Sequence, residues 1–530
     1  MLIIINISNY NYEFKFKKTT NIVKNILLLK LSFLAFTFIN AQDNIQLEKF
    51  QTFESYSDEN YDHPLRPQFH FTSLKGWNND PNGMVFYDGE YHLYFQHNPL
   101  DVVWGNMTWG HAVSKDMVHW KQLNHAILPY KDGTIFSGTA VVDHNNSLGK
   151  NTKENKAIVA FYTHAQNSKS NWFYQSAAYS LDNGRSFTLI NEGNGIVQNQ
   201  GFDRGERDPK VFWHEESKKW IMILWVKRGN DTFTGPDTGP GNVTKLGKVR
   251  FFESNDLVNW RKLFDFDRNW VYECMDMVEL PVDGDKSNKK WLLYDASFDY
   301  EIGDFDGKSF RTDGKVGMGD LGKHYYAAQT FNNSPDDRVI IIGWMATEEI
   351  RINSPRDKNI FIENKTSWNQ QMSFPSKMEL KTAKKGVKLF RTPIKEIERL
   401  YLKSYNFKNK SIKYLNNKMK SQEIDLVDVS FDFEKNKHQK LVFDIGGEKI
   451  TLKNKKFIFQ GIEVPVSEEL KTNFRVLLDR SSIEIFFNNG EHVLSSYIDP
   501  DKKNKRIKIE SENNNKLNCN LNIMKSAWVN

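Results

Sequence analysis

Short apolar runs separated by turn residues dominate the middle of the chain. Between Phe69 and about Leu380 we find no long helical periodicity, and the apolar segments have the length of single strands. The clearest of them are residues 84–95, 157–162, 219–226, 290–297 and 338–346. The first contains Asp88-Gly89, a dipeptide that favours a tight hairpin. Many short strands with turns between them are typical of an all-β sandwich, barrel or propeller.

A short internal repeat favours the propeller. Residues 114–120 (SKDMVHW) resemble residues 254–260 (SNDLVNW), and residues 180–187 and 306–310 are looser copies. The copies recur at intervals that suit one four-stranded blade plus insertions. In each copy we expect the Asp to cap a turn and the aromatic residue to pack between blades. A chance similarity among surface turns is the alternative.

The pattern changes past about residue 395, where Lys and Asn become frequent. Polar and apolar residues alternate clearly over 474–487, and a second strand over 492–498 follows Asn489-Gly490, which predicts a hairpin. These features predict a C-terminal β-sandwich. The expected organisation is a signal peptide over 1–41, an N-terminal linker over 42–64, a propeller over 65–385, a linker over 386–400 that ends in a short helix, and a sandwich over 401–530.

The N-terminal region has the pattern of a secretory signal peptide. Basic residues precede an apolar stretch over 26–39, which only Lys30 interrupts, and the small residue Ala41 stands before the expected cleavage point at Gln42. The stretch is too short and too interrupted for a comfortable membrane span. We therefore expect a secreted or periplasmic protein with no membrane span after cleavage, and an uncleaved anchor is the alternative.

Composition excludes several classes of protein for this chain of 530 residues. An aromatic content of 14% argues against disorder, a mean hydropathy of −0.61 against a polytopic membrane protein, and two Cys against a disulfide scaffold. The two Cys are expected to be free and buried. The net charge of +6 is spread along the chain, so no nucleic-acid partner is expected. The 13 His show no metal-ligand spacing.

Three carboxylates stand near strand starts in different predicted blades. Asp80 lies in an amide-rich turn, Asp208 follows Arg207, and Glu273 precedes an apolar strand. Innermost strands of a propeller start at the same end of the central channel, so these side chains are expected to converge there. Two carboxylates about 5–5.5 Å apart suit retaining glycoside hydrolysis. Taken singly, each residue also has a structural interpretation: an Asx-turn for Asp80, a local ion pair for Asp208 and a satisfied core acid for Glu273.

Aromatic residues flank these acids and are suited to pack on the apolar faces of sugars. They are Trp77, Phe95, Trp104, Trp109, Phe136, Trp213 and Trp344. Burial in the core is the alternative for each of them. Trp104 and Trp109 lie in a Gly-bounded loop, which makes these two the better candidates for sugar contacts.

Several segments together resemble glycoside hydrolase family 32, the β-fructofuranosidases. Residues 70–99 (HFTSLKGWNNDPNGMVFYDGEYHLYFQHNP) resemble the opening signature of that family. Further matches, which extend the resemblance over about residues 65–530, lie at 136–138, 207–213, 272–274, 322–331, 343–345 and 477–491. The resemblance implies a five-bladed propeller joined to a β-sandwich, retention at the anomeric carbon, and no metal or organic cofactor.

The resemblance also implies roles for individual residues. Asp80 matches the nucleophile, Glu273 the acid/base, and Asp208 the transition-state stabiliser that binds fructose hydroxyls. The positions expected to bind substrate are Trp77, Asn78, Asn79, Gln96, Trp104, Phe136, Ser137, Arg207 and Trp344. Two departures stand out: Asn78 replaces a residue that is often hydrophobic, and Ser376 replaces a frequent Arg.

The expected function is the release of fructose from β-fructosides (levan, inulin or sucrose) by an exo-acting fructan hydrolase. Endo-levanase and sucrose-specific invertase are the alternatives within the family, and a non-catalytic fructan-binding protein is a more distant one. Loop shape decides between an exo pocket and an endo cleft, and the oligomeric state is open. For the sandwich we favour a stabilising clamp over an auxiliary sugar-binding module, because its signature is an apolar hairpin rather than an exposed aromatic platform.

Overall fold

The computed structural model describes eleven stretches of the chain. These are residues 6–7, 10–11, 56, 59–166, 172–228, 247–346, 360–434, 440–466, 471–498, 503–512 and 515–528. The chain divides into two compact units, Met1–Gln51 and Thr52–Asn530. In the first unit the described residues are β1 (Asn6–Ile7) and β2 (Tyr10–Asn11), which pair antiparallel. The rest of the predicted signal peptide and most of the predicted linker over 42–64 lie outside the described residues.

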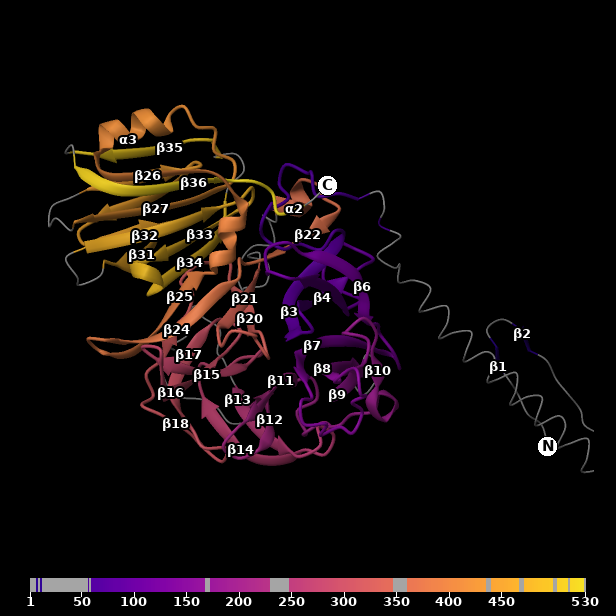
Figure 1. Cartoon of the computed structure of the whole chain (residues 1–530). Coiled ribbons are helices and arrows are strands. Elements are labelled where there is room, and N and C mark those ends of the chain that lie inside the picture. Colours follow the sequence, from indigo (N-terminus) through magenta and orange to yellow (C-terminus); the bar gives the residue numbers. More distant parts are fainter. Residues whose placement is uncertain are drawn as a thin grey trace, which may run out of the picture. The chain divides into compact units, whose positions relative to one another are not determined.

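Three separate antiparallel sheets form the first three blades of a propeller in the second unit (Figure 1). The first blade contains β3 (Gly76–Tyr87), β4 (Glu90–Asn98), β5 (Thr108–Ser114) and β6 (Lys121–Ile127). The second contains β7 (Gly133–Val142), β8 (Ile158–Gln166), β9 (Phe173–Ser180) and β10 (Thr188–Leu189), followed by the 3-10 turn η2 (Ile190–Gly193). The third contains β11 (Glu206–His214), β12 (Lys219–Lys227), β13 (Gly247–Ser254) and β14 (Arg261–Arg268).

The fourth and fifth blades share one sheet, because β15 and β24 pair in parallel through Val282 and Leu380. The fourth contains β15 (Asp276–Val282), β16 (Asp285–Tyr294), β17 (Asp299–Phe305), β18 (Phe310–Thr312) and β19 (Gly317–Met318). The fifth contains β20 (Tyr326–Thr330), β21 (Val339–Met345), β23 (Gln371–Met372), β24 (Ser376–Ala383) and β25 (Gly386–Pro393). The five-bladed propeller implied by the resemblance is confirmed.

A short strand from the end of the propeller closes the ring onto its beginning. After α2 (Ile360–Glu363), β22 (Trp368–Asn369) pairs in parallel with the start of β3, at Gly76 and Trp77. Gly76 has a φ of +76°, and a Cβ at this position would lie 2.2 Å from the carbonyl oxygen of Asn98. Only glycine therefore fits where β22, β3 and β4 meet.

The repeated Asp residues cap turns, as the sequence predicted. Asp116 accepts hydrogen bonds through Oδ1 from the backbone N–H groups of Val118 at 3.0 Å and His119 at 2.9 Å. Asp256 makes the same pair of contacts, and Asp182 and Asp306 cap similar turns. All four turns connect the third strand of a blade to the fourth. The following aromatic residues pack between blades, for example Trp260 on Phe161 with ring centroids 5.9 Å apart.

Two sheets form the C-terminal sandwich (Figure 1). One contains β26 (Tyr401–Ser411), β36 (Lys516–Met524), β27 (Val427–Glu434), β32 (Lys471–Leu478), β33 (Ser482–Phe487) and β34 (His492–Tyr497). The other contains β31 (Ile462–Pro465), β30 (Lys456–Phe459), β29 (Glu448–Lys453), β28 (Leu441–Ile445) and β35 (Ile507–Ser511), with α3 (Ile412–Met419) beside it. The predicted hairpin is present: β33 pairs with β34 across the turn η5 (Asn488–Gly490).

The expected linker over 386–400 is wrong for most of its length. Residues 386–393 form β25, which pairs along its whole length with β24 in the fifth blade. Leu389 and Arg391 are buried and alternate with less buried neighbours, which suits an outer blade strand. Because the buried residue at 391 is polar and the less buried residue at 390 is the apolar Phe390, the pattern of apolar and polar residues did not reveal this strand. The connection to the sandwich is the 3-10 helix η4 (Lys395–Leu400), so the predicted short helix is confirmed.

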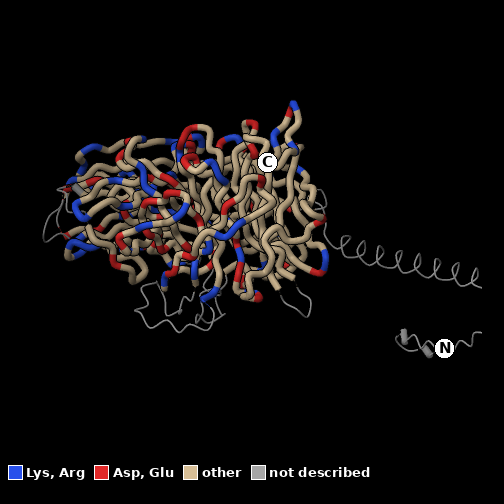
Figure 2. The backbone as a smooth tube through the Cα atoms, turned by 90° about the horizontal axis from the view of Figure 1, so that it is seen from below, with Lys and Arg blue, Asp and Glu red and all other residues tan. Residues whose placement is uncertain are grey.

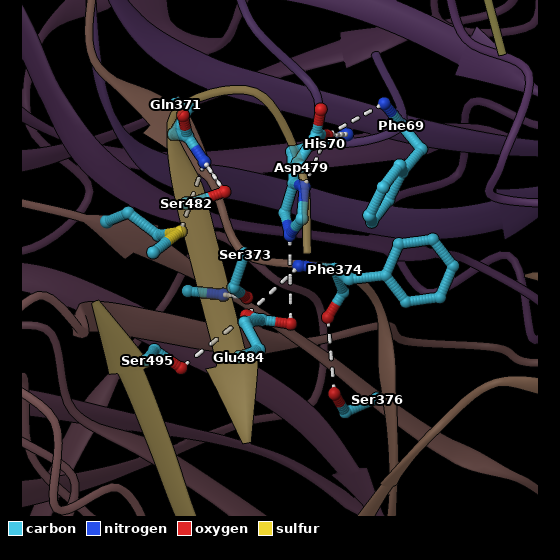
Figure 3. A network of polar contacts seen from close by, with 12 residues as sticks. Phe69, His70, Gln371, Ser373, Phe374, Ser376, Asp479, Ser482, Glu484 and Ser495 are labelled. Atoms are coloured by element: carbon cyan, nitrogen blue, oxygen red, sulfur yellow. Dashed lines mark hydrogen bonds and ion pairs between the residues drawn. The ribbon is translucent and has the colours of Figure 1, made fainter. Parts of the chain in front are cut away.

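The sandwich binds the segment that leads into β3 through buried polar contacts (Figure 3). Asp479, in the β32–β33 turn, accepts hydrogen bonds from the backbone N–H groups of Gln68 at 2.7 Å and Phe69 at 3.0 Å. It also contacts Nδ1 of His70 at 2.8 Å, while Glu484 Oε2 lies 3.8 Å from Nε2 of the same ring. These side chains are fully buried or nearly so. Burial lowers the pKa of His70, but the hydrogen bonds and charges of the two acids outweigh it and raise the pKa to about 9.

Two further features agree with the composition. Acidic and basic residues are interspersed along the chain (Figure 2). Cys274 and Cys519 are both free and buried, as predicted.

Within the described ranges, no helix has the length and apolar character needed to cross a membrane.

Candidate active site

The first strands of the five blades surround the central channel and bring the three predicted carboxylates together. β3 contacts both β7 and β20, β7 contacts β11, and β20 contacts β15. Asp80 is in the first half of β3, Asp208 is near the start of β11, and Glu273 lies just before β15. The expected convergence at one end of the channel is therefore observed.

Two side chains link the three carboxylates. The thiol of Cys274 lies 3.4 Å from Oδ2 of Asp80 and 3.5 Å from Oδ2 of Asp208. Arg207 donates from Nε to Oε2 of Glu273 at 2.8 Å, and the same nitrogen lies 3.7 Å from Oδ2 of Asp208. The site is thus one connected cluster of three acids, one guanidinium and one thiol.

Asp80 is held by donors on both of its oxygens. Ser137, on β7, donates to Oδ2 at 2.5 Å, and the Asn79 amide donates to Oδ1 at 3.0 Å. The indole N–H of Trp77 in turn donates to the amide oxygen of Asn79 at 2.9 Å. Burial raises the pKa of Asp80 to about 6; the Ser137 donor opposes this rise and the charge of Glu273 adds to it.

Asp208 is the most deeply buried of the three acids and has an unusual backbone. Its φ is +65°, and Cys274 has a φ of +46°, so both residues occupy the left-handed region that non-glycine residues avoid. The Asp208 amide N–H donates to Thr163 Oγ1 at 2.9 Å, and the Cys274 amide N–H donates to Oδ2 of Asp208 at 3.0 Å. Burial raises the pKa of Asp208, and the charges of Glu273 and Asp80 raise it further against the opposing charge of Arg207. Strained backbone of this kind is typical of functional sites.

Glu273 is held by residues from two other blades. The hydroxyl of Tyr326, on β20, donates a hydrogen bond to Oε1 at 2.6 Å, while Arg207 binds Oε2. Burial and the charge of Glu273 raise the pKa of Tyr326 well above its ordinary value, so its hydroxyl stays protonated. Arg207 also lies over the ring of Trp225, 4.5 Å from the centroid. Sequence reasoning missed Tyr326 and the contacts of Cys274. Tyr326 lies within the segment 322–331 that carries the resemblance, but nothing in its spacing marks it.

The remaining predicted substrate-binding residues fall into two groups. Trp104 is 57% exposed, and its ring meets that of Phe136 edge-on with centroids 5.9 Å apart. Phe136 directly precedes Ser137 on β7. Gln96 is buried; when the Asn82 amide is oriented to donate to Ser137 Oγ at 3.2 Å, its oxygen accepts from Gln96 Nε2 at 2.9 Å. Asn82 therefore supports Ser137, a role that the sequence did not suggest.

Asn78 and Trp344, the other two predicted substrate-binding residues, are buried. Asn78 accepts hydrogen bonds through Oδ1 from the amide and hydroxyl groups of Ser73, each at 3.1 Å. Trp344 packs edge-on against Trp77 and Tyr326, at 6.0 and 6.1 Å between centroids. Asn78, one of the two positions that depart from the family pattern, thus holds the segment before β3. At the other such position, the Ser376 hydroxyl donates to the carbonyl oxygen of Phe374.

Trp109 is not the sugar contact that its loop position favoured. It is fully buried, and its indole N–H donates to the carbonyl oxygen of Phe136 at 3.0 Å. It belongs to a cluster of apolar side chains between the first two blades, together with Tyr94 and Tyr162. The reason for the difference is that β5 begins at Thr108, so Trp109 is a strand residue rather than part of the loop.

A buried ion pair ties three of the innermost strands together next to the acids. Lys210, two residues after Asp208, donates to Oδ2 of Asp276 at 3.0 Å and to Oγ1 of Thr330 at 3.0 Å. Asp276 also accepts from the Thr330 amide N–H at 2.7 Å. Lys210 and Asp276 are almost fully buried. The strands β11, β15 and β20 are therefore fixed to one another close to the site.

The described parts of the chain contain no group of three or more His, Cys, Asp or Glu side chains arranged to hold a metal ion.

Two family models match the chain in succession. The model described as "Glycosyl hydrolases family 32 N-terminal domain" matches residues 70–393, and "Glycosyl hydrolases family 32 C terminal" matches residues 404–525. The chain belongs to glycoside hydrolase family 32. It is therefore a glycosidase, and the first match covers the propeller from before β3 to the end of β25.

Individual relatives of this family 32 glycosidase span most of its length. A levanase of Bacillus subtilis is 34% identical over 525 residues, which cover 89% of this chain and 72% of the relative. An extracellular exo-inulinase of Aspergillus niger is 29% identical over 518 residues, which cover 83% of this chain and 90% of the relative. The crystal structure of an exo-inulinase from Aspergillus awamori has the same fold, with a TM-score of 0.72 and 24% identity over 88% of this chain and 100% of that one.

Proposed function

We propose that this glycosidase is a retaining β-fructosidase that releases fructose from the ends of fructans and also cleaves sucrose. The linkage of Asp80, Asp208 and Glu273 through Cys274 and Arg207 is the observation that carries the proposal. Burying several carboxylates close together costs free energy, and clusters of this kind are typical of functional sites. The similarity to a levanase and to an exo-inulinase supports fructans as the substrate class.

In the proposed first step, Asp80 attacks C2 of the fructosyl unit as the nucleophile. Glu273 gives its proton to the departing glycosidic oxygen, so the bond from C2 to that oxygen breaks as the bond to Asp80 forms. A pKa of about 6 leaves Asp80 largely ionised at neutral pH, as a nucleophile requires. Ser137 and Asn79 orient the two oxygens of this carboxylate.

In the proposed second step, Glu273 accepts a proton from water, and the resulting hydroxide displaces Asp80 from C2. The product keeps the β configuration because two inversions occur at the same carbon. Asp208, fixed by the Cys274 amide N–H, is proposed to bind fructose hydroxyls and to stabilise the positive charge that develops on the ring. Trp104 and Phe136 are proposed to pack on the apolar face of the sugar.

Exo action and secretion belong to the same proposal. A closed pocket for one terminal fructose gives free fructose, whereas an open cleft gives oligosaccharides. The apolar stretch over 26–39 supports export from the cytoplasm, as does the description of one relative as extracellular.

A time course with levan tests the action pattern. The purified chain is incubated with levan, and products are resolved by length at low conversion. We expect free fructose alone from the earliest samples; an early ladder of oligosaccharides would replace exo action by endo action. The same reaction in the presence of methanol tests retention, because transfer to methanol must then give methyl β-fructofuranoside, whereas the α anomer would refute the double displacement.

Asp80→Asn tests whether the chain acts as an enzyme through the proposed nucleophile. The substitution keeps the shape of the side chain, so the fold is expected to be unchanged. Turnover of sucrose is expected to fall by several orders of magnitude, since removal of a nucleophile of this kind costs about 10⁴ to 10⁶ in rate. Unchanged turnover would refute the assignment of Asp80.

A further inference from the structure

The sandwich has a polar groove on the face of its larger sheet that points away from the sandwich core. The groove has a volume of about 360 Å³ and runs across β26, β36, β27 and β32, next to η4. Its volume falls within the range of about 300–1,000 Å³ that is common for small-ligand sites. Every described residue that lines it has a side chain able to form hydrogen bonds, and none of them is a lysine.

The strand register sets these side chains in rows. Asn406, Asn520, Ser430 and Arg475 stand directly opposite one another on the four adjacent strands. Ser404, Asn522 and Asp428 form the next row. The residues between them, such as Val429 and Phe431, face the sandwich core.

The amides in the groove are already oriented by one another. The Asn406 amide donates to Oδ1 of Asn520 at 2.7 Å, and the Asn520 amide donates to the Ser430 hydroxyl at 3.3 Å. Asn406 and Asn520 are nevertheless exposed to solvent. Each amide has two N–H donors and an oxygen with two lone pairs, so one such contact leaves further hydrogen-bonding capacity for a ligand.

A rigid ion pair forms the buried side of the groove. Arg475 donates from Nε to Oδ1 of Asp428 at 2.8 Å and from Nη2 to Oδ2 at 2.5 Å, and the Tyr401 hydroxyl also donates to Asp428. This two-pronged contact fixes the guanidinium in one plane and cancels its charge. Preformed planar groups of this kind bind neighbouring hydroxyls with little loss of side-chain entropy.

The chemistry of the groove excludes other classes of ligand. A polyanion requires unpaired positive charge, but the arginine is paired with Asp428 and Glu398 lies nearby. An apolar partner requires an apolar surface, which amides and hydroxyls do not provide. Neutral molecules with many hydroxyl groups fit the alternating donors and acceptors.

We infer that this groove is a second carbohydrate site, which holds part of a β-fructan chain without cutting it. The identity of the sugar rests on the proposed function, because a β-fructan is then the neutral polyhydroxyl polymer that this protein binds. A second site raises the effective concentration of chain ends near the catalytic acids. The sandwich then binds substrate through hydrogen bonds, in addition to binding the segment before β3.

The test compares a groove variant with a matched control in the full chain. Asn406→Leu combined with Asn520→Leu removes two amides from the groove, and Asn417→Leu changes an exposed amide on α3. Each is placed in a Glu273→Gln chain, which we expect not to turn over levan, and retention by levan is measured by affinity electrophoresis. We expect the groove variant to bind levan at least about fivefold more weakly than the control, because one hydrogen bond is worth about that factor.

The same substitutions in the otherwise unchanged chain separate this proposal from the proposed function. Hydrolysis of sucrose should remain within about twofold of the parent, because Asn406 and Asn520 lie on strands of the sandwich whereas the three acids lie in the propeller. Equal levan retention by the groove variant and the control would overturn the second site. Failure of the unchanged chain to hydrolyse any β-fructoside would instead overturn the proposed function. Asn406→Ala with Asn520→Ala repeats the test without added bulk if the leucine variant does not fold.

Discussion

The hydroxyl of Ser137 donates to Oδ2 of Asp80 at 2.5 Å and so connects the second blade to the first. This contact opposes the effect of burial, which raises the pKa of Asp80 to about 6. Because a donor favours the ionised form of a carboxylate, Ser137 increases the fraction of Asp80 that is ready to attack. The acid side of the pH–rate profile should therefore depend on this hydroxyl.

Ser137→Ala tests this dependence. Loss of the donor raises the pKa of Asp80 above about 6, so the acidic limb of the kcat/KM profile should move to higher pH. A hydrogen bond to a charged group is worth about 1.5 kcal/mol, which corresponds to a shift of about one pH unit. Measurement of kcat/KM for sucrose from pH 4 to pH 8 decides the question. Ser137→Thr keeps the hydroxyl and should restore the original limb, and an unmoved limb in the alanine variant would contradict the role.

Glu273→Ala should affect substrates according to their leaving groups. An acid that protonates the departing oxygen contributes about 10²–10⁴ in rate. We therefore expect sucrose hydrolysis to fall by about 10³, whereas β-fructosyl fluoride, whose leaving group needs little protonation, should lose far less. Initial rates with the two substrates give the comparison. Asp80→Ala serves as the contrast, because loss of the nucleophile should abolish both reactions; equal losses in the Glu273 variant would refute the acid role.

Lys210→Met should destabilise the propeller strongly. It leaves Asp276 as a buried charge without its cationic partner, a change that typically costs about 3–5 kcal/mol in the free energy of unfolding. Adding Asp276→Asn removes that charge and should recover part of the loss. Urea unfolding of the two variants measures both effects. Lys286→Met, which breaks an ion pair exposed to solvent with Asp337, is the control and should change stability by less than about 1 kcal/mol. A Lys210→Met variant as stable as the parent would show that the buried ion pair does not hold the strands together.

The contact of His70 with Asp479 should make stability depend on pH in the alkaline direction. The folded-state pKa of His70 is about 9, above its ordinary value of 6.5, so protonated His70 stabilises the folded state. This contribution is present in full below pH 6.5 and is lost as the pH rises through 9. Its size is on the order of 3 kcal/mol, since one pKa unit corresponds to about 1.4 kcal/mol.

Urea unfolding of the parent and of His70→Asn at pH 6 and pH 9.5 measures this contribution. The asparagine amide still donates to Asp479 but does not titrate, so the difference in stability between the two pH values should shrink. His119→Asn, in a turn on the first blade, controls for the general effect of losing a histidine. A parent and a His70 variant with the same pH dependence would refute the ion pair at the sandwich.

Local patterns in the sequence determined the strands and many of the turns. Asp88-Gly89 and Asn489-Gly490 mark hairpins because their residues adopt positive φ at low cost, and both hairpins are present. The repeated Asp residues marked the connections between third and fourth strands because a carboxylate caps its own turn. These interactions act within a few residues, so the sequence displays them directly. The strand β25 was missed and assigned to a linker, because buried Arg391 and less buried Phe390 obscure the alternation of apolar and polar residues that marks a half-buried strand.

The tertiary structure alone decided which atoms meet in the site. The three acids could be named from their settings and from the family resemblance, but Cys274 bridges Asp80 and Asp208 across separations of 194 and 66 residues. Tyr326 reaches Glu273 only because the ring of blades closes and brings β20 beside β15. Such contacts depend on the pitch of the blades and on ring closure, which the packing of the whole propeller sets. No spacing along the chain encodes them, and the same holds for the rows of amides that face outward from the sandwich.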